Sequence, residues 1–261
     1  MAELADALDS GSSALTGVEV QVLFPALSDA SAGLPAGVFL RPLSPSPGRL
    51  EPPTFGVHLW VADPDRPPLP PDDRLEVLSA AEQERFTRMG HRPAADRFAR
   101  SRGRLRHLLA CYRGENPAAV SLTVSPDGKP EVAGGPHFNL SHTAGRLLIA
   151  VAASPVGVDV EPVRPVPAAD DLVRRWFHAD EVGQYFALPA DRRPAAFRRG
   201  WTCKEALLKG VGCGARELAG CVVELDPDRP PAVRLSPDGR AWHLAAWEAD
   251  GFAAAVAVRA G

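Results

Sequence analysis

The chain has 261 residues, of which 45% are hydrophobic and 23% charged, so it can form one large globular domain or two modest ones. Its formal net charge of −3 excludes a general nucleic-acid-binding protein, because such a protein needs a basic face to neutralise phosphates. No apolar run reaches the length of a membrane span and no basic residue precedes Arg41 as in a signal peptide, so we expect a cytoplasmic protein without nucleic-acid or membrane partners.

Residues 1–54 are rich in Ala, Ser, Gly and Pro, and we expect them to form an N-terminal extension that is partly disordered or loop-rich. Within this segment, "VEVQVLF" (18–24) alternates like a strand. The following "RPLSPSPGRLEPP" (41–53) is typical of a linker.

The next segments alternate between strand and helix patterns. "FGVHLWVAD" (55–63) is predicted to be a strand from its apolar and aromatic content. "LSAAEQERFTRM" (78–89) has Ser79 and Glu82 in capping-box spacing, which predicts a helix start. "AADRFARSRGRLRHLLACY" (94–112) predicts a second helix with one face crowded with arginines. These are Arg97, Arg100, Arg102, Arg104 and Arg106.

After these helices the pattern indicates strands. "SLTVSPDGKPEV" (121–132) has an Asp-Gly pair between two runs, the usual hairpin signal. "HFNLSHTAGRLLIAVAA" (137–153) predicts a second hairpin that turns at Ala144-Gly145, and "VGVDVEPV" (156–163) a further short strand.

The second part of the chain repeats this order in outline. Helical segments are predicted at 168–188 and 192–210, and the tetrapeptide SPDG at 125–128 returns at 236–239. Gly145 before "RLLIAVA" has a counterpart in Gly251 before "FAAAVAV". We therefore predict an α+β fold in which two similar halves are related by a pseudo-twofold axis, with the active site between them. The predicted halves are residues 55–155 and 156–261.

The hexapeptide "VGVDVE" (156–161) carries two acids at alternating positions of a strand, so Asp159 and Glu161 share one face. Two carboxylates about 4 Å apart repel by about 4 kcal/mol at an effective dielectric of about 20, so a buried pair needs a cation or a proton. Hard oxygen ligands suit Mg²⁺, which takes further oxygens from substrate phosphates. The alternative is that both acids lie on a solvated strand face.

Lysine is rare in this chain: only three of the 29 Lys and Arg residues are lysine, and two of these lie in "WTCKEALLKG" (201–210). On a helix, Glu205 and Lys209 are neighbours and Lys204 is adjacent. An exposed ion pair is the simple interpretation of this spacing, but it does not explain why lysine is kept here. Lysine is a compact, mobile charge that can follow a transferring phosphate, whereas the arginine fork is rigid.

A third group of polar residues lies in "GKP" (128–130) and "HFNLSH" (137–142), which contain Lys129, Ser141 and His142. Adjacent strand residues face opposite ways, so Ser141 and His142 do not form a nucleophile–base pair. Both could reach an anion at the end of a strand, or His142 could make a structural hydrogen bond.

Taken together, "VGVDVE" followed by "WTCKEALLK" resembles the paired signature of the 4′-phosphopantetheinyl transferases of the surfactin-synthetase-activating (Sfp-like) type. The helix "RFARSRGRLRHLL", the "GKP" turn and "FNLSH" are also similar to family patterns, in the same order, and the resemblance spans roughly residues 55–258. The fixed positions that match are Gly157, Asp159, Trp201, Thr202, Lys204, Glu205, Ala206 and Lys209.

This resemblance implies an enzyme with holo-acyl-carrier-protein synthase activity. Coenzyme A would bind between the two halves, and Mg²⁺ would bridge its pyrophosphate to Asp159, Glu161 and Glu205. The 4′-phosphopantetheine group would pass to a serine of an apo acyl or peptidyl carrier protein, and adenosine 3′,5′-bisphosphate would leave. Because both halves belong to one chain, a monomer is expected.

The resemblance and the residue types together suggest individual roles. Glu205 is the candidate base toward the carrier serine, with Asp159 as the alternative. Phosphoryl transfer needs positioning and charge neutralisation, so the cationic and polar side chains are candidates for the phosphates of coenzyme A. For the pyrophosphate these are Lys204, Lys209 and His142, and Ser141 is a further candidate for contact with coenzyme A. For the 3′-phosphate or adenine end they are Lys129, Arg97 and Arg102.

Two other classes of protein fit parts of this pattern. A non-catalytic module would bind coenzyme A without releasing the bisphosphate. A metal-dependent phosphohydrolase would release phosphate or pantetheine in the absence of a carrier protein.

Overall fold

A computed structural model describes residues 20–22, 41–42, 49–54, 56–65 and 75–261. Helices and strands alternate along these residues, so the predicted α+β class is confirmed. In this part of the chain, none of the helices has both the length and the apolar character needed to cross a bilayer. All four cysteines are free thiols.

The first half of the chain forms one strand, two helices and two hairpins, in the predicted order. Their bounds are β3 (Val57–Ala62), α2 (Ala80–Arg88), α3 (Arg92–Arg113), β4 (Leu122–Val124), β5 (Pro130–Val132), β6 (His137–Thr143) and β7 (Arg146–Ala152). The second half repeats the order of strand, helices and strands. Its elements are β8 (Val156–Pro162), α4 (Ala169–Trp176), α5 (Ala179–Ala187), α6 (Arg193–Val211), β9 (Val222–Val223), β10 (Val233–Leu235), β11 (Trp242–Ala249) and β12 (Phe252–Arg259).

Two helices begin with side-chain caps that can be recognised in the sequence. Ser79 and Glu82 form the predicted capping box at the start of α2. The segment 168–188, in contrast, is two helices and not one. A second reciprocal cap begins α5, because the His178 side chain accepts from the Asp180 amide and Glu181 accepts from the His178 amide.

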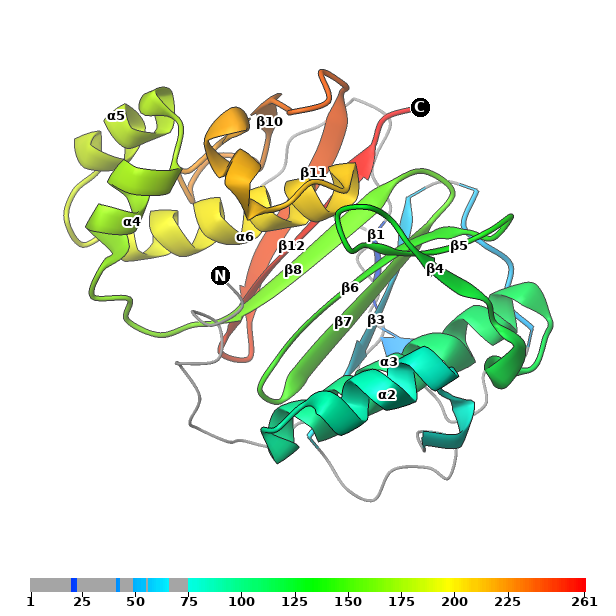
Figure 1. Cartoon of the computed structure of the whole chain (residues 1–261). Helices are drawn as coiled ribbons and strands as arrows, with labels where there is room; N and C mark the ends of the chain where they lie inside the picture. Colours follow the sequence, from blue (N-terminus) through cyan, green and yellow to red (C-terminus); the bar gives the residue numbers. More distant parts are fainter. Residues whose placement is uncertain (1–19, 23–40, 43–48, 55, 66–74) are drawn as a thin grey trace.

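Two mainly antiparallel sheets lie side by side, with β8 next to β6 (Figure 1). The first has the order β1-β3-β7-β6, and the second β11-β12-β8. The described parts of the N-terminal extension, β1 (Val20–Val22) and β2 (Arg41–Pro42), pair with β3. β1 confirms the centre of the strand predicted at 18–24, and the rest of that prediction lies outside the described residues.

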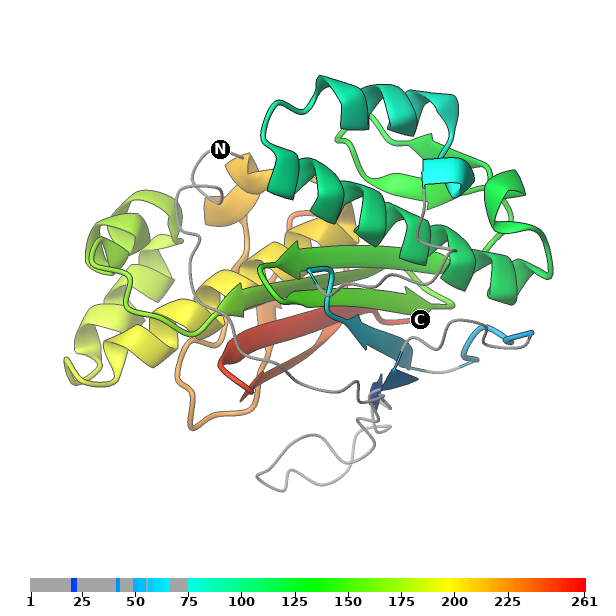
Figure 2. The same ribbon diagram turned by 90° about the horizontal axis from the view of Figure 1, so that it is seen from below.

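Each sheet has one face covered by a long helix. Helix α3 packs Leu105, Leu108 and Leu109 against the strands of the first half, and α6 packs against β11 and β12 (Figure 2). The other faces of the two sheets meet in a shared core. Val57 and Leu59 of β3 lie in this core with residues of β8 and β12. The two halves are therefore joined by apolar packing as well as by the chain.

The repeated SPDG segments form the same turn twice. The amide of Gly128 donates to the carbonyl of Ser125 at 2.9 Å, and the amide of Gly239 to that of Ser236 at 3.0 Å. Their surroundings differ, since the first turn joins the paired strands β4 and β5. The second turn joins β10 to β11, but β10 pairs with β9.

Candidate functional site

The site begins with a close approach between β8 and α6. A side chain on Gly157 would place its Cβ 2.0 Å from the carbonyl oxygen of Ala206 and 2.2 Å from the amide of Gly210. Only glycine lets the two backbones come so near. Val158 and Val160 point into the shared core, so Asp159 and Glu161 lie on the face that carries Gly157 and faces α6.

Asp159 is the most deeply placed acid of the site, with 2% of its surface exposed. Its Oδ1 accepts hydrogen bonds from Ser141 Oγ at 3.0 Å and from Lys209 Nζ at 2.5 Å. Its Oδ2 is buried and has no hydrogen-bond partner. A buried carboxylate oxygen without a partner is costly in a folded protein, so it marks a place where a ligand can bind.

Glu161 and Glu205 complete an acidic cluster, which we define as Asp159, Glu161 and Glu205. Burial, followed by the charges of Asp159 and Glu205, raises the pKa of Glu161 to about 7, against the opposing effect of Lys209 and Arg164. Burial and Asp159 likewise raise the pKa of Glu205. These carboxylates lie close enough to disfavour one another's charge, which is the condition that a bound cation relieves.

The ammonium group of Lys209 lies beside this cluster. Nζ contacts Asp159 Oδ1 and also donates to Ser141 Oγ at 3.3 Å. Burial lowers the pKa of Lys209, but Asp159 and Glu205 outweigh it and hold the pKa above its ordinary value. The side chain keeps 31% exposure, so a charged Lys209 can meet a ligand from solvent.

His142 and Arg97 lie near Lys209 and add further groups that can bind an anion. Desolvation of the ring, followed by the charges of Arg97 and Lys209, lowers the pKa of His142. Arg97 is oriented by Asp65, whose Oδ1 accepts from Arg97 Nε at 3.0 Å. Asp65 Oδ2 also accepts from the amide of Gly145 at 2.7 Å, so the same carboxylate holds α3 to the β6–β7 turn.

The interpretation of Lys204 as a phosphate ligand is wrong in this structure. Its side chain has 0% exposure, and Nζ donates to Glu181 Oε2 and to the carbonyl of Cys221, each at 2.5 Å. The ammonium group also lies over the ring of Phe177, 5.0 Å from its centroid. Successive helix residues point about 100° apart, so Lys204 enters the core of the second half while Glu205 reaches the site.

Three other predicted ligands have protein partners. Arg102 is paired with Glu82 at 3.3 Å between α2 and α3, and its role at the 3′-phosphate stays a prediction. Lys129 Nζ donates to the main-chain carbonyls of Val156 and Gly210. Ser141 donates its hydroxyl proton to Asp159 and so positions that carboxylate, while its contact with an anion stays a prediction.

Sequence reasoning missed three residues that organise this region. Glu181 is the buried partner of Lys204, and its place in the "HADE" cap was a readable signal. Asp65, which orients Arg97, gave no signal, because its partner is 32 positions away. Asn139 lies in the quoted "FNLSH" segment, and its Oδ1 accepts from the amide of Val158 at 2.9 Å.

The donor chemistry fits a hard divalent cation, although the ligands are not preassembled. Among the residues that the structure describes, no three His, Cys, Asp or Glu side chains are grouped as a ready-made metal site. The acidic cluster nevertheless offers carboxylate oxygens, including the unpartnered Oδ2 of Asp159. Oxygen-only donor sets of this kind suit Mg²⁺.

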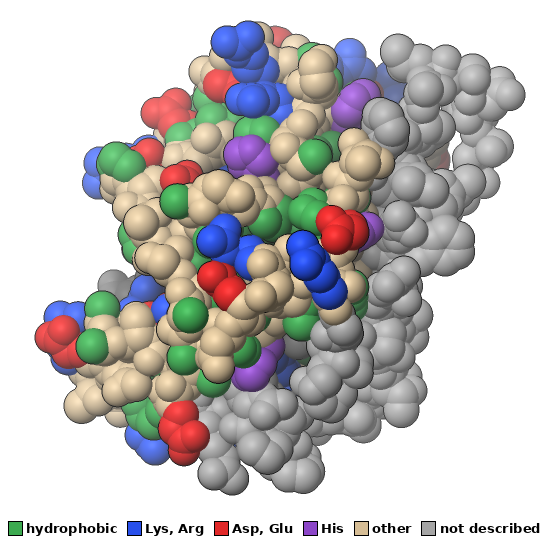
Figure 3. Space-filling model, turned by 90° about the vertical axis from the view of Figure 1, so that its right-hand side faces the viewer, with side chains coloured by type: hydrophobic (Ala, Val, Ile, Leu, Met, Phe, Trp, Pro, Cys, Tyr) green, Lys and Arg blue, Asp and Glu red, His purple; other side chains and the backbone are tan. Residues whose placement is uncertain are grey.

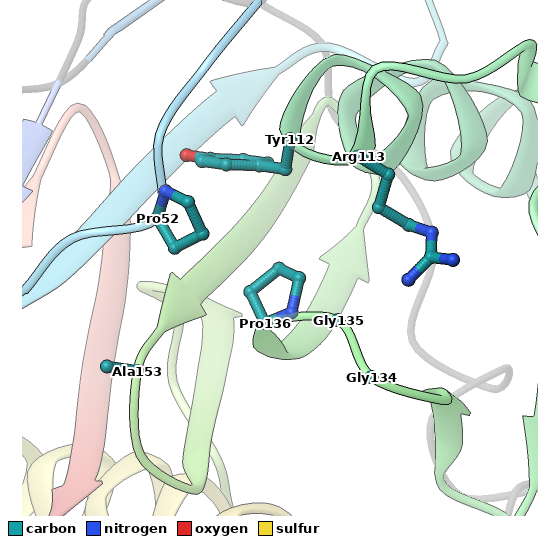
Figure 4. Close-up of a pocket in the computed structure, with 7 residues that line it drawn as sticks. All are labelled: Pro52, Tyr112, Arg113, Gly134, Gly135, Pro136 and Ala153. Carbon is teal, nitrogen blue, oxygen red and sulfur yellow. The ribbon is translucent and has the colours of Figure 1, made fainter.

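A separate shallow pocket of about 500 Å³ lies at the opposite end of β6 from Ser141. Figure 4 shows the rings of Pro52, Tyr112 and Pro136 around this space, with Arg113 directed away from them. This pocket contains none of the acidic cluster. On the face drawn in Figure 3, positive, negative and hydrophobic side chains are interspersed over the described residues, so no basic surface gathers there.

Comparison with known proteins identifies the family. The 4′-phosphopantetheinyl transferase superfamily matches residues 155–257. The 4′-phosphopantetheinyl transferase HetI of Nostoc sp. is 34% identical over 194 residues, which are 72% of this chain and 81% of HetI. The chain therefore belongs to the 4′-phosphopantetheinyl transferase superfamily. Within it the chain is an enzyme of the Sfp-like type, as predicted from the motifs.

Other relatives agree with this assignment. A 4′-phosphopantetheinyl transferase of Bacillus subtilis is 30% identical over 64% of this chain and 75% of its own length. Sfp of Bacillus subtilis is 24% identical over 70% of this chain and 82% of its own length. Among solved structures, the holo-(acyl-carrier-protein) synthase of Thermotoga maritima aligns at 22% identity with a TM-score of 0.34, over 41% of this chain and 62% of that one. That structural similarity is too distant to bear on the site.

Proposed function

We propose that this enzyme transfers the 4′-phosphopantetheine group of coenzyme A to a serine of an apo acyl or peptidyl carrier protein, with Mg²⁺, and releases adenosine 3′,5′-bisphosphate. The observation that carries the proposal is Asp159: a buried carboxylate with one oxygen held by Lys209 and the other without a partner. Family membership supports the transfer reaction. Since both halves of one chain contribute to the site, a monomer would be sufficient for activity. The location we propose is the cytoplasm.

The acidic cluster would hold the metal. Asp159 would contribute its unpartnered Oδ2, and Glu161 and Glu205 would contribute carboxylates whose pKa values are raised by burial and by the charge of Asp159. Bound Mg²⁺ supplies positive charge to pyrophosphate oxygens and orients them. The chain's own part is to keep the carboxylates together on β8 and α6.

Cationic side chains would bind the phosphates directly. Lys209 lies beside the cluster and is partly exposed, so it is placed for the pyrophosphate. Arg97 and His142 would neutralise phosphate on the side of the first half, where Asp65 holds Arg97 in place. A phosphate near His142 would offset the charges that now lower its pKa, so binding would favour the protonated ring.

Glu205 is our candidate for the base toward the carrier serine. Its carboxylate lies in the acidic cluster beside Asp159 and Lys209, where the carrier serine would approach the pyrophosphate. Asp159 suits this role less well, since its Oδ1 already accepts two hydrogen bonds and is held by an ammonium group. The serine proton would pass to Glu205 as the hydroxyl attacks phosphorus.

A mass measurement tests the proposed reaction. An apo carrier protein incubated with the enzyme, coenzyme A and Mg²⁺ should gain one phosphopantetheinyl unit, with an equal amount of adenosine 3′,5′-bisphosphate released. A panel of fatty-acid, polyketide and peptide carriers would also identify the partner. Tight coenzyme A binding without mass gain on any carrier would contradict the proposal, and so would release of pantetheine or phosphate without a carrier.

The Asp159→Ala variant tests the metal assignment. We expect a loss of carrier modification larger than the roughly 10–100-fold typical when a group that only supports a metal ligand is removed. Calorimetric titration should also show weaker Mg²⁺ binding in the presence of coenzyme A. The matched control is Asp171→Ala on α4, whose side chain is 86% exposed and whose ion-pair partner among the described residues is Arg174 of the same helix. Near-normal turnover of Asp159→Ala would contradict the assignment.

A further inference from the structure

Strand β8 has one edge that the main chain of the described residues does not pair. In its sheet β8 is hydrogen-bonded to β12 only, and its opposite edge faces β6. Val156, Val158 and Val160 along this edge are 0%, 0% and 2% exposed, so water does not reach their peptide groups freely. Buried amides and carbonyls without partners are costly, so this edge needs hydrogen bonds from another source.

Two side chains of β6 satisfy the amides of this edge. Asn139 Oδ1 accepts from the amide of Val158 at 2.9 Å, and Ser141 Oγ accepts from the amide of Val160 at 3.3 Å. The acceptors are two residues apart on β6, and the donors are two residues apart on β8. The two-residue period of a strand therefore lets both contacts form in one register.

A third side chain of the first half continues the series. Lys129, from the β4–β5 hairpin, donates from Nζ to the carbonyl of Val156 at 3.1 Å. Positions 156, 158 and 160 are thus each hydrogen-bonded to a side chain of the other half. Lys129 Nζ also donates to the carbonyl of Gly210 at 3.0 Å, in the last turn of α6, so the same ammonium ties β8 to the helix that carries Glu205.

We propose that Lys129, Asn139 and Ser141 form a side-chain ladder that replaces main-chain pairing between the two halves and fixes the register of β8. In this ladder Asn139 is a positioning residue for Asp159. A one-residue slip of β8 would turn Asp159 from the α6 face into the shared core. The ladder opposes this slip, because only with Val160 at Ser141 does the same hydroxyl also reach the carboxylate of Asp159.

Ser141 links the register directly to the acidic cluster. Its Oγ accepts from the Val160 amide and from Lys209, and donates to Asp159. The hydrogen bond that aligns the strand and the one that orients the carboxylate therefore share an atom. A change at Asn139 is transmitted to Asp159 through β8 and through the geometry around this hydroxyl.

The test is Asn139→Leu, which keeps the size of the side chain and removes the acceptor. In the full-length protein, hydrogen exchange at the amide of Val158 should become about tenfold faster or more, because its hydrogen bond is lost. Exchange in the β3–β7 pair should not change. The kcat for carrier modification should fall by about 10–100-fold, with KM for coenzyme A within about twofold of wild type, as for a residue that supports a metal ligand.

Two further variants separate the ladder from a general loss of packing. Asn139→Asp keeps the accepting oxygen and should restore most of the protection at Val158, whereas Asn139→Leu should not. Asn116→Leu removes a similar Asn acceptor, at 2.9 Å from the Ala118 amide outside the ladder, and should leave exchange along β8 unchanged. If Asn139→Leu does not fold, Ser141→Ala gives the same measurement at the amide of Val160.

Unchanged exchange at Val158 in Asn139→Leu would overturn the proposal, as would equal loss of protection in Asn139→Leu and Asn139→Asp. Only the kinetic arm rests on the proposed function. If the wild-type enzyme modifies no carrier, the proposed function fails, while the exchange measurements still decide whether the ladder exists.

Discussion

Lys209 lies where a small charged group is required. Its Nζ is 2.5 Å from Asp159 Oδ1 and 3.3 Å from Ser141 Oγ, in a space bounded by β6, β8 and α6. An ammonium group fits this space because it is compact, whereas a guanidinium is planar and has fixed donor directions. This geometry accounts for a lysine in a chain that otherwise uses arginine for nearly all its basic residues.

We therefore expect Lys209→Arg to reduce kcat for carrier modification by about tenfold or more, although the charge is unchanged. Steady-state kinetics with one carrier protein would measure this. Arg88→Lys, at a 71% exposed position on α2, serves as the reverse substitution away from the site and should have no effect. Unchanged kinetics in Lys209→Arg would show that a point charge is not needed there.

At the scale of elements, the contact between β8 and α6 sets the site. Gly157 lets the strand lie against the helix backbone near Ala206 and Gly210, and this contact brings the acids of β8 to the face of α6 that carries Glu205 and Lys209. The neighbouring atoms belong to the main chain, so they cannot move aside as a flexible side chain would.

Gly157→Ala should consequently destabilise the protein by about 3 kcal/mol, toward the upper end for overpacked cores, and abolish activity. Chemical denaturation would give the change in the free energy of unfolding. Gly183→Ala is the matched control: nothing lies within 4 Å of its Cβ, it is in helix α5, and the change should stabilise by about 0.5–1 kcal/mol. A Gly157→Ala variant as stable as wild type would contradict the close approach.

Helix α6 is also fixed from its other side by the buried pair of Lys204 and Glu181. Lys204 Nζ donates to Glu181 and to the carbonyl of Cys221, and its ammonium group lies over the ring of Phe177. Glu181 in turn accepts from the amide of Val223 at 2.8 Å. The pair therefore joins α5, α6 and β9, and holds the helix rotation that directs Glu205 to the site.

Removing one partner should leave a buried uncompensated charge. We expect Lys204→Met to cost about 3–5 kcal/mol of unfolding free energy, with part of this recovered when Glu181→Gln is added. Denaturation of the two single variants and the double variant measures the coupling. The folded fraction of Lys204→Met should keep its KM for coenzyme A. A stable Lys204→Met variant with a raised KM for coenzyme A would instead show that Lys204 binds the phosphates.

For the whole molecule, the two halves behave as one packed unit because they share a core. Residues of β3 and β7 from the first half pack with residues of β8 and β12 from the second. The acidic cluster adds to this junction, since Ser141 of the first half holds Asp159 of the second. Neither the core nor the site is complete within one half.

This shared core predicts a single cooperative unfolding transition. Scanning calorimetry should give one peak whose calorimetric enthalpy equals the van't Hoff enthalpy, because separating the halves exposes apolar surface of both. Fluorescence and circular dichroism should report the same midpoint. Two resolved transitions would show that each half is stable without the other.

Much of this structure followed from local signals. The capping box at Ser79, the alternation in "VGVDVE" and the Asp-Gly turn at 127–128 each depend on residues a few positions apart, so the sequence predicts them correctly. The motifs also identified the family. The break between α4 and α5 was missed, because a His cap is an unusual signal in the middle of a helical pattern.

The sequence by itself determined the α+β class, the family and the two segments that carry the acids of the site. Only the tertiary structure decided which cations face those acids. Lys204 and Lys209 lie on one helix, yet one is buried against Glu181 and the other meets Asp159. The physical reason is that tertiary packing decides which groups lie near a charged side chain. Glu181 is 23 residues from Lys204 in the sequence, and Asp159 is 50 residues from Lys209. Periodicity places residues on a face, but long-range packing selects what that face meets.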